Sequence, residues 1–156
     1  MAKVVSIQVA AESRAPMREV QSVRAVPGKG LEGDRYFSGA GSFSQNPGSG
    51  REVTLIEAEA LEALEKELKL VIGLGETRRN IVTRGVALNH LVDREFTVGD
   101  VRLRGMRLCE PCKGLAEITG QPGILPGLIH RGGLRCEILS EGLIRSGDAV
   151  GFDLSD

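Results

Sequence analysis

Large aromatic side chains are scarce in this chain. Its 156 residues include no Trp, one Tyr and four Phe, against 21 glycines. Few large core anchors and frequent glycine favour many short elements joined by turns. Lysine is scarce too, since arginine outnumbers it 15 to 5. Because the planar guanidinium group captures phosphate or carboxylate in a bidentate way that an ammonium group cannot, the composition predicts an anionic ligand.

Long hydrophobic runs are also missing. No apolar run approaches the roughly 20 residues that cross a bilayer, and charged residues such as Glu12 and Arg14 interrupt the only region where a signal peptide could lie. The formal net charge of −1 disfavours a nucleic-acid coat. We therefore expect a single domain over residues 1–156 with neither a membrane nor nucleic acid as partner. The sequence leaves the oligomeric state open.

Cysteine is limited to three residues. An odd number does not make a disulfide framework in a domain of this size, which favours a reducing compartment, the cytoplasm. Cys136 alternates with apolar residues, so we expect it to be a small buried group of the core.

The hydrophobic pattern predicts many short strands and one long helix. The helix covers residues 58–70, and Thr54 with Glu57 matches a capping box before it. These elements predict a mainly β fold, an antiparallel β-barrel with one long helix and short helical decorations rather than a sheet of βαβ units. The expected strands are residues 4–9, 19–26, 51–56, 95–98, 101–108, 134–139 and 149–152.

Three local signals add detail to this fold. Gly99 and Asp100 predict a tight hairpin turn, and the apolar positions of the next strand change parity around Gly105, which predicts a β-bulge there. Residues 38–50 are rich in Gly, Ser and Asn and are predicted to be a mobile surface loop.

The pair Cys109 and Cys112 is the sharpest candidate site. Two thiols three residues apart can form a reversible disulfide, bind zinc, or place one reactive thiolate at a helix N-terminus. Thioredoxin-type chemistry requires a βαβ fold, and structural zinc requires about four ligands, whereas only the scattered Cys136, His90 and His130 remain. The third reading is therefore preferred, with Cys112 after Pro111 as the reactive thiol.

An arginine-rich segment supplies the second candidate. Its candidate residues are Arg78, Arg79, Asn80 and Arg84. They are either charges on a solvated strand or a clamp for an oxyanion or phosphate. The clamp is favoured because the residues that follow Asn80 are apolar and look buried, and because Asn is a poor strand former. Two loops could add further groups: Asp34 and Arg35 follow a Gly-rich stretch, and His130 and Arg131 precede two glycines.

Together these segments resemble the MOSC domain, named after the C-terminal domain of molybdenum cofactor sulfurase, in its stand-alone bacterial form. The resemblance covers most of the chain. It is carried by segments in a specific order and spacing: Gly30-Leu31-Glu32-Gly33-Asp34-Arg35, residues 77–86, Phe96-Thr97-Val98-Gly99-Asp100, Cys109-Glu110-Pro111-Cys112, and His130-Arg131-Gly132-Gly133-Leu134-Arg135 with the later Gly147-Asp148.

The resemblance implies a β-barrel-like fold and binding of the molybdenum cofactor, molybdopterin. It implies that Cys112 is the functional thiol, as sulfur carrier or molybdenum ligand, with Cys109 and His130 as candidates for catalytic support. The pterin phosphate would be held by the cationic and polar residues Arg78, Arg79, Asn80, Arg84, Asp34, Arg35 and Arg131.

The resemblance also frames the partners and the open alternatives. In fused eukaryotic sulfurases a pyridoxal-phosphate desulfurase precedes this domain, so family descriptions include pyridoxal phosphate. Because 156 residues leave no room for that desulfurase domain, pyridoxal phosphate is not expected to bind here. Expected partners are molybdopterin, a persulfide donor such as a cysteine desulfurase, and redox proteins. The resemblance implies either sulfur transfer or molybdenum-dependent reduction of N-hydroxylated compounds as the chemistry. The alternative is a non-catalytic module that binds a cofactor or zinc.

Overall fold

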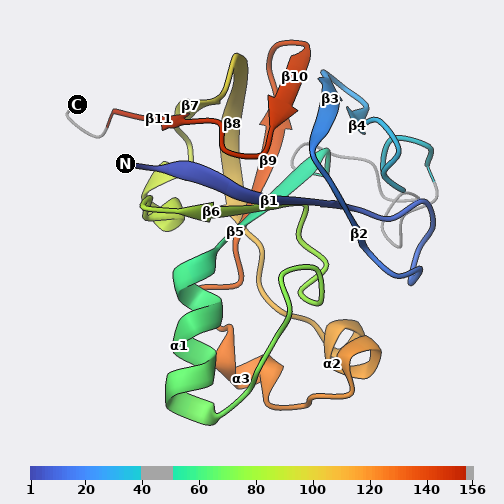
Figure 1. Ribbon diagram of the computed structural model, residues 1–156, viewed down its shortest axis with the longest axis vertical. Coiled ribbons are helices and arrows are strands. Elements are labelled where there is room, and N and C mark those ends of the chain that lie inside the picture. The colour runs from blue at the N-terminus through green and yellow to red at the C-terminus, as the bar shows by residue number, and fades with distance from the viewer. Residues whose placement is uncertain (40–50, 154–156) are drawn as a thin grey trace.

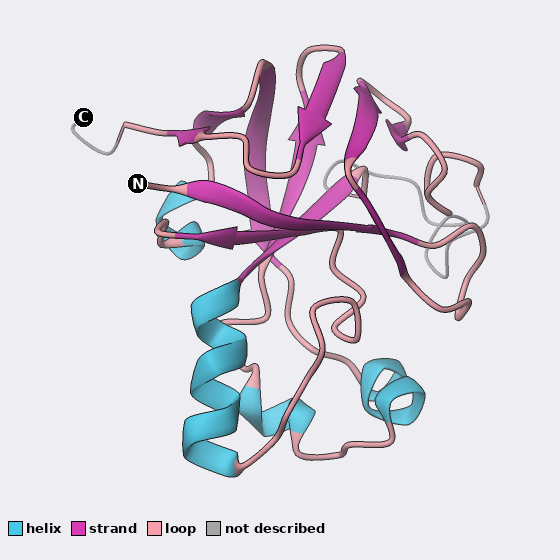
Figure 2. Ribbon diagram, viewed as in Figure 1, coloured by secondary structure: helices cyan, strands magenta, loops and turns pink. Residues whose placement is uncertain are grey.

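The computed structural model describes residues 1–39 and 51–153 and is mainly β, as the sequence predicts. The strands gather in one half of the molecule, and the α-helices lie below them in Figures 1 and 2. The larger, curled sheet has the order β11-β7-β8-β9-β5-β6-β1-β2. Its strands are β1 (Lys3–Val9), β2 (Arg18–Val20), β5 (Val53–Glu57), β6 (Ile81–Arg84), β7 (Glu95–Val98), β8 (Val101–Leu108), β9 (Leu134–Ile138) and β11 (Val150–Gly151).

The remaining elements form a small sheet and the helical layer. The small sheet has the order β10-β3-β4. Its strands are β3 (Ser22–Val26), β4 (Gly30–Leu31) and β10 (Gly142–Arg145), and the helices are α1 (Ala58–Leu68), the 3-10 turn η1 (Leu88–Leu91), α2 (Lys113–Thr119) and α3 (Ile124–Gly127). None of the helices in the described part of the chain has the length and apolar character to cross a membrane.

The expected antiparallel arrangement fails at one pair of strands. β5 and β6 are parallel, with Leu55 opposite Ile81, and α1 lies in the crossover between them. Four consecutive residues of β5 are buried, Val53 to Ile56. One face of the strand packs inside the curled sheet, and its other face packs against the helices. The molecule therefore contains the βαβ unit that the sequence analysis had set aside.

The predicted helix is confirmed from its first residue, but its end needs correction. α1 ends at Leu68 rather than residue 70, since Lys69 adopts a left-handed φ of 58° that stops the helix. The predicted capping box is wrong: Glu57 is the N-cap without a side-chain cap bond, and Thr54 is inside β5, where its hydroxyl bonds to Asn80.

Other local predictions have mixed outcomes. The hairpin at Gly99 and the bulge at Gly105 are both confirmed by the β7–β8 pairing and the register shift against β9. Residues 19–26 divide between two sheets as β2 and β3, and β10, which pairs with β3, lies outside the predicted strands. The predicted loop at residues 38–50 falls, after Gly39, outside the described residues.

Two apolar clusters hold these layers together. One fills the curled sheet and includes Leu55, Ile81 and Leu103. The other joins the outer face of β5 and β6 to the helices, through Leu64 of α1 and Leu115 of α2. The second cluster anchors α2 next to the ends of β5 and β9, where a cavity opens.

Candidate functional site

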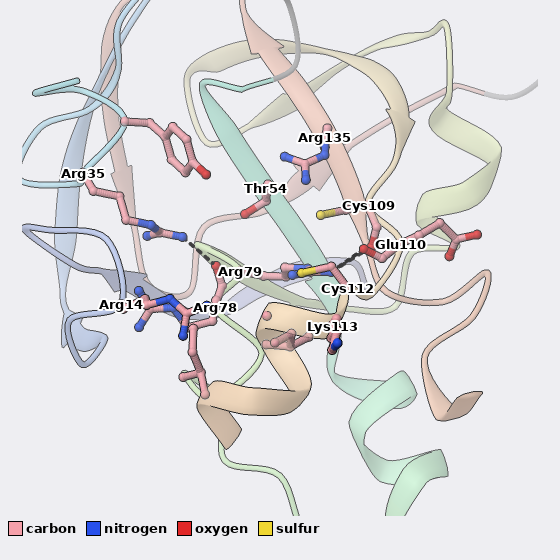
Figure 3. A pocket seen from close by; sticks show the side chains of 14 residues that line it. Arg14, Arg35, Thr54, Arg78, Arg79, Cys109, Glu110, Cys112, Lys113 and Arg135 are labelled. Carbon is pink, nitrogen blue, oxygen red and sulfur yellow. Dashed lines mark hydrogen bonds between the residues drawn. The ribbon is translucent and has the colours of Figure 1, made fainter. Parts of the chain in front are cut away.

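A cavity of about 370 Å³ opens between the sheet and α2. This volume is within the range of small-molecule and cofactor sites. Figure 3 shows its lining side chains, which come from the loop before β2, the segment after β4, β5, the segment before β6, the Cys109–Cys112 loop, α2 and β9. The lining residues are Arg14, Arg35, Tyr36, Thr54, Arg78, Arg79, Cys109, Glu110, Cys112, Lys113, Gly114, Leu115, Ile118 and Arg135.

The lining of this cavity is strongly cationic. Five arginines and Lys113 line it, against one carboxylate, that of Glu110. Glu110 is bonded to His130, whose backbone N–H donates to Oε1 at 2.7 Å and whose Nδ1 lies 2.8 Å from Oε2. Its carboxylate points away from the arginines in Figure 3. The cavity therefore favours an anion.

Cys112 is the exposed thiol of this cavity. It is the N-cap residue of α2, in extended conformation, and makes no side-chain cap bond. A Cβ atom added to Gly114 would lie 3.7 Å from Cys112 Sγ and 3.5 Å from Arg14 Nη2. The missing side chain of Gly114 thus leaves a gap that the thiol and a guanidinium group share.

The other two thiols are buried. Cys109 lies in the wall of the cavity with 2% of its surface exposed. Cys136 is in β9, inside the curled sheet, and burial raises its pKa well above the usual value for a thiol, with the nearby Cys109 as a smaller cause. The expectation that Cys136 is a buried group of the core is confirmed.

Arg79 braces the loop that carries the thiols. It is buried, and its Nε donates to the carbonyl oxygen of Gly132 at 2.7 Å. Its Nη2 donates to the carbonyl oxygen of Cys109 at 2.8 Å, and its Nη1 to that of Thr77 at 3.0 Å. Because backbone carbonyls take these donors, Arg79 orders the cavity wall.

Arg78 faces the cavity from an irregular backbone. Its φ is +67°, so the chain turns there and regular pairing begins only at Ile81. This is why two successive arginines, 78 and 79, both line one cavity, which a regular strand would not allow. Arg78 Nη1 donates to the carbonyl oxygen of Ala15. Burial lowers the pKa of Arg78, and the neighbouring charges of Arg35 and Arg14 lower it further.

Asp34 holds Arg35 in place. Asp34 is buried, and its Oδ1 accepts from Arg35 Nη1 at 3.0 Å and from the backbone N–H of Ala10 at 3.1 Å. Arg35 Nη2 donates to the carbonyl oxygen of Arg78 at 3.3 Å, and its guanidinium carbon lies 5.0 Å from the centre of the Tyr36 ring. Arg35 lines the cavity, whereas Asp34 lies behind Arg35 and holds its guanidinium group.

The structure does not bring the remaining predicted residues into the cavity lining. Arg84 pairs with Glu62 of α1, its Nη1 3.1 Å from Oε1. Arg131 pairs with Glu67 at 3.1 Å and so ties the end of α3 to α1. Both arginines therefore pair with α1 and do not line this cavity, whereas Arg78 and Arg79 of the predicted segment do.

Asn80 and His130 have supporting positions. Asn80 is buried; its Oδ1 accepts from the N–H of Thr54 at 3.1 Å, and its Nδ2 donates to the carbonyl oxygen of Gln8 at 3.1 Å. It therefore joins β5 to β1 rather than facing a ligand. His130 is exposed and touches the cavity only through Glu110.

Sequence reasoning missed several lining residues. Lys113 directly follows the predicted thiol, and Arg135 ends the segment that begins at His130, so their proximity in sequence was a usable signal. Arg14 and Thr54 carried no such signal, because only the tertiary fold brings them here.

The described residues offer no set of ligands for the zinc alternative. Across residues 1–39 and 51–153, no group of three or more His, Cys, Asp or Glu side chains is placed to hold a metal ion. A structural zinc site needs about four such ligands.

The comparisons with known proteins identify the family. The MOSC domain family model matches residues 42–151, so the chain belongs to the MOSC domain family. Members of this family are linked to binding of the molybdenum cofactor. A search of curated proteins found no match.

Solved structures support the same fold. YuaD from Bacillus subtilis aligns with a TM-score of 0.78 at 15% identity, over 98% of each chain. YiiM from Geobacillus stearothermophilus aligns with a TM-score of 0.74 at 16% identity, over 97% of this chain and 74% of its own. YiiM from Escherichia coli gives 0.69 at 16% identity, over 100% of this chain and 72% of its own.

Proposed function

We propose that this MOSC protein binds the molybdenum cofactor in the cavity described above, with Cys112 as its functional thiol. One observation carries the proposal: an exposed thiol stands at a cavity lined by five arginines and a lysine. A phosphorylated pterin needs cationic hydrogen-bond donors, and a metal centre bound to sulfur needs a thiolate. The cavity offers both.

The donor set assigns separate tasks to the lining residues. Arg78 and Arg35 are mutually close cations on one wall, and they would hold the phosphate group. Cys112 would face the molybdenum, with the side-chain-free Gly114 beside the thiol. When bound, the cofactor would supply a redox-active metal centre. Arg79 would keep the loop of Cys112 in place through its bonds to Cys109 and Gly132.

Sulfur carriage is a second role that the exposure of Cys112 favours. A donor protein that carries a persulfide can reach this thiol. The Cys112 thiolate would attack the terminal sulfur of that persulfide; a new S–S bond forms at Cys112, the donor's S–S bond breaks, and the donor leaves as a thiolate. Reduction of N-hydroxylated compounds would instead require an electron-donating partner protein.

Metal and pterin analysis tests the proposal. Apoprotein is mixed with cofactor released from a molybdoenzyme, separated from unbound cofactor, and assayed for molybdenum and for the fluorescence of the oxidised pterin. We expect both in near-equal amounts in the parent and in the Cys136→Ala control, with molybdenum reduced in Cys112→Ser. A parent protein that retains neither after reconstitution would overturn the proposal.

A separate assay addresses sulfur carriage. The protein is incubated with a cysteine desulfurase and cysteine, and its intact mass is measured. We expect a gain of one sulfur atom that Cys112→Ser abolishes and Cys136→Ala leaves. Absence of the gain in the parent, with the desulfurase itself loaded with persulfide, would remove the sulfur-carrier role and leave cofactor binding in place.

A further inference from the structure

The rim of the cavity next to Cys112 carries two charged residues to which the cofactor proposal gives no separate task. Arg14 comes from the loop between β1 and β2, and Lys113 is the first residue of α2, directly after the thiol. Both line the cavity, and neither belongs to the segments assigned to the phosphate. Figure 3 shows Arg14 beside Arg78, with Lys113 below Cys112.

The backbone holds Arg14 in an uncommon conformation. Its φ is +62°, in the left-handed region that residues with a Cβ atom rarely adopt. Two contacts fix the loop around it: Arg78 Nη1 donates to the carbonyl oxygen of Ala15, and the N–H of Ala10 donates to Asp34 Oδ1 at 3.1 Å. Such a conformation persists only where the surrounding structure imposes it.

The geometry at Gly114 places Arg14 at the thiol. An added Cβ atom there would lie in ordinary contact with both Arg14 Nη2, at 3.5 Å, and Cys112 Sγ, at 3.7 Å. The guanidinium group and the sulfur atom therefore lie next to the same point, where one carbon atom fits in van der Waals contact, and both residues line the cavity. A reactant that reaches Cys112 from this cavity therefore comes close to the charge of Arg14.

The charges of Arg14 and Lys113 are only weakly neutralised by nearby carboxylates. Arg14 pairs with Glu117 at 3.5 Å, but 58% and 54% of the two side chains are exposed, so the pair is a weak competitor for a ligand. Lys113 forms no ion pair within the described residues. The carboxylate of Glu110 is already bonded to His130.

We propose that Arg14 and Lys113 form an anion-selecting entrance at Cys112, so that the small molecule that reacts there carries an oxyanion such as a carboxylate or sulfonate. This inference rests on the proposed role of Cys112 as the functional thiol. It names the charge of the reactant, which cofactor binding alone leaves open. Arg14 and Lys113 attract and orient that anion, and they form no bond with the reacting atoms.

Matched thiol reagents test the entrance on the apoprotein. The rate of alkylation of Cys112 is measured with anionic iodoacetate and with neutral iodoacetamide; in both cases an S–C bond forms and iodide leaves. A sulfonate-bearing and a neutral methanethiosulfonate form a second pair. Because each pair meets the same thiolate, the ratio of anionic to neutral rate reports the local potential at Cys112. A cysteine-containing peptide gives the reference ratio.

We expect a ratio several-fold above that of the peptide, which falls as ionic strength rises. Arg14→Gln and Lys113→Gln should each lower it about threefold, as expected for one charge a few ångströms away in a water-like medium. Glu117→Gln should raise it, and Arg14→Lys should retain it. Arg145→Gln, an exposed arginine on β10, is the control for net charge and should change nothing.

The outcomes separate this inference from cofactor binding. A parent ratio equal to that of the peptide, or a double variant Arg14→Gln with Lys113→Gln that keeps the parent ratio, would overturn the entrance even if the protein binds molybdenum. A high ratio that both variants reduce supports the entrance even if reconstitution fails. Circular dichroism of each variant shows that the fold is kept.

Discussion

The guanidinium group of Arg79 reaches from the segment before β6 to the loop of the thiols, where its Nη2 donates to the carbonyl oxygen of Cys109 at 2.8 Å. The same side chain donates to the carbonyl oxygen of Gly132 at 2.7 Å, so one cation joins three segments that are distant in sequence. The loop that leads to Cys112 is therefore held by a buried side chain whose donors are taken by backbone carbonyl oxygens.

Arg79→Gln should destabilise the fold. The substitution leaves buried carbonyl oxygens without donors, which costs about 1–3 kcal/mol in the free energy of unfolding. Urea unfolding measures the change. Arg84→Gln is the matched control, since its exposed pair with Glu62 should contribute only about 0–1 kcal/mol. An equal decrease in the free energy of unfolding for the two variants would show that the hydrogen bonds of Arg79 do not stabilise this loop.

Gly132→Ala should displace the loop of the thiols. A Cβ atom at this position would lie 2.4 Å from the carbonyl oxygen of Cys109, so the backbone has to move. Overpacking of this kind costs about 1–3 kcal/mol. We also expect the buried thiol of Cys109 to react faster with a neutral alkylating reagent, as measured by peptide mass mapping. Unchanged protection of Cys109 would contradict the packing described for this loop.

Gly114→Ala should slow the reaction of Cys112 without destabilising the fold. Its Cβ atom meets only Arg14 and Cys112, at ordinary contact distances, and alanine favours the helix by about 0.5–1 kcal/mol over glycine. We expect an unchanged or higher midpoint of thermal unfolding together with several-fold slower alkylation of Cys112. Alkylation at the parent rate would show that the gap is not the route to the thiol.

Cys136 should be inert in the folded protein. Burial raises its pKa, so at neutral pH the folded protein holds almost no thiolate at this position. Iodoacetamide should label Cys112 within the folded protein, and Cys136 only after unfolding in urea. Labelling of Cys136 ahead of Cys112 would contradict the assignment of the functional thiol.

Local signals predicted the parts of the fold that depend on neighbouring residues. The hairpin at Gly99 follows from its own turn sequence, and the bulge at Gly105 from the change of parity in one strand. Packing also requires glycine at the bulge, because a Cβ atom at Gly105 would lie 2.1 Å from the carbonyl oxygen of Leu91. That contact could not be read from the sequence.

Tertiary structure decided the rest. The parallel pairing of β5 with β6 depends on α1 covering β5, and a short apolar strand carries no mark of its partner's direction. Likewise, Arg78 and Arg84 looked equivalent in the sequence, but the left-handed backbone at Arg78 turns it to the cavity while Arg84 pairs with α1. Arg14 reaches the same cavity from about 60 residues earlier in the chain.

The affinity of the apoprotein for molybdopterin, compared between Arg78→Gln and Arg84→Gln, tests the central claim most directly. A charge-assisted hydrogen bond to phosphate is worth about 1.5–3 kcal/mol. We therefore expect Arg78→Gln to raise the Kd by roughly tenfold to a hundredfold, and Arg84→Gln to leave it at the parent value, since that side chain lies outside the cavity lining. Equal affinity of the parent and both variants would contradict the claim that this cavity holds the cofactor.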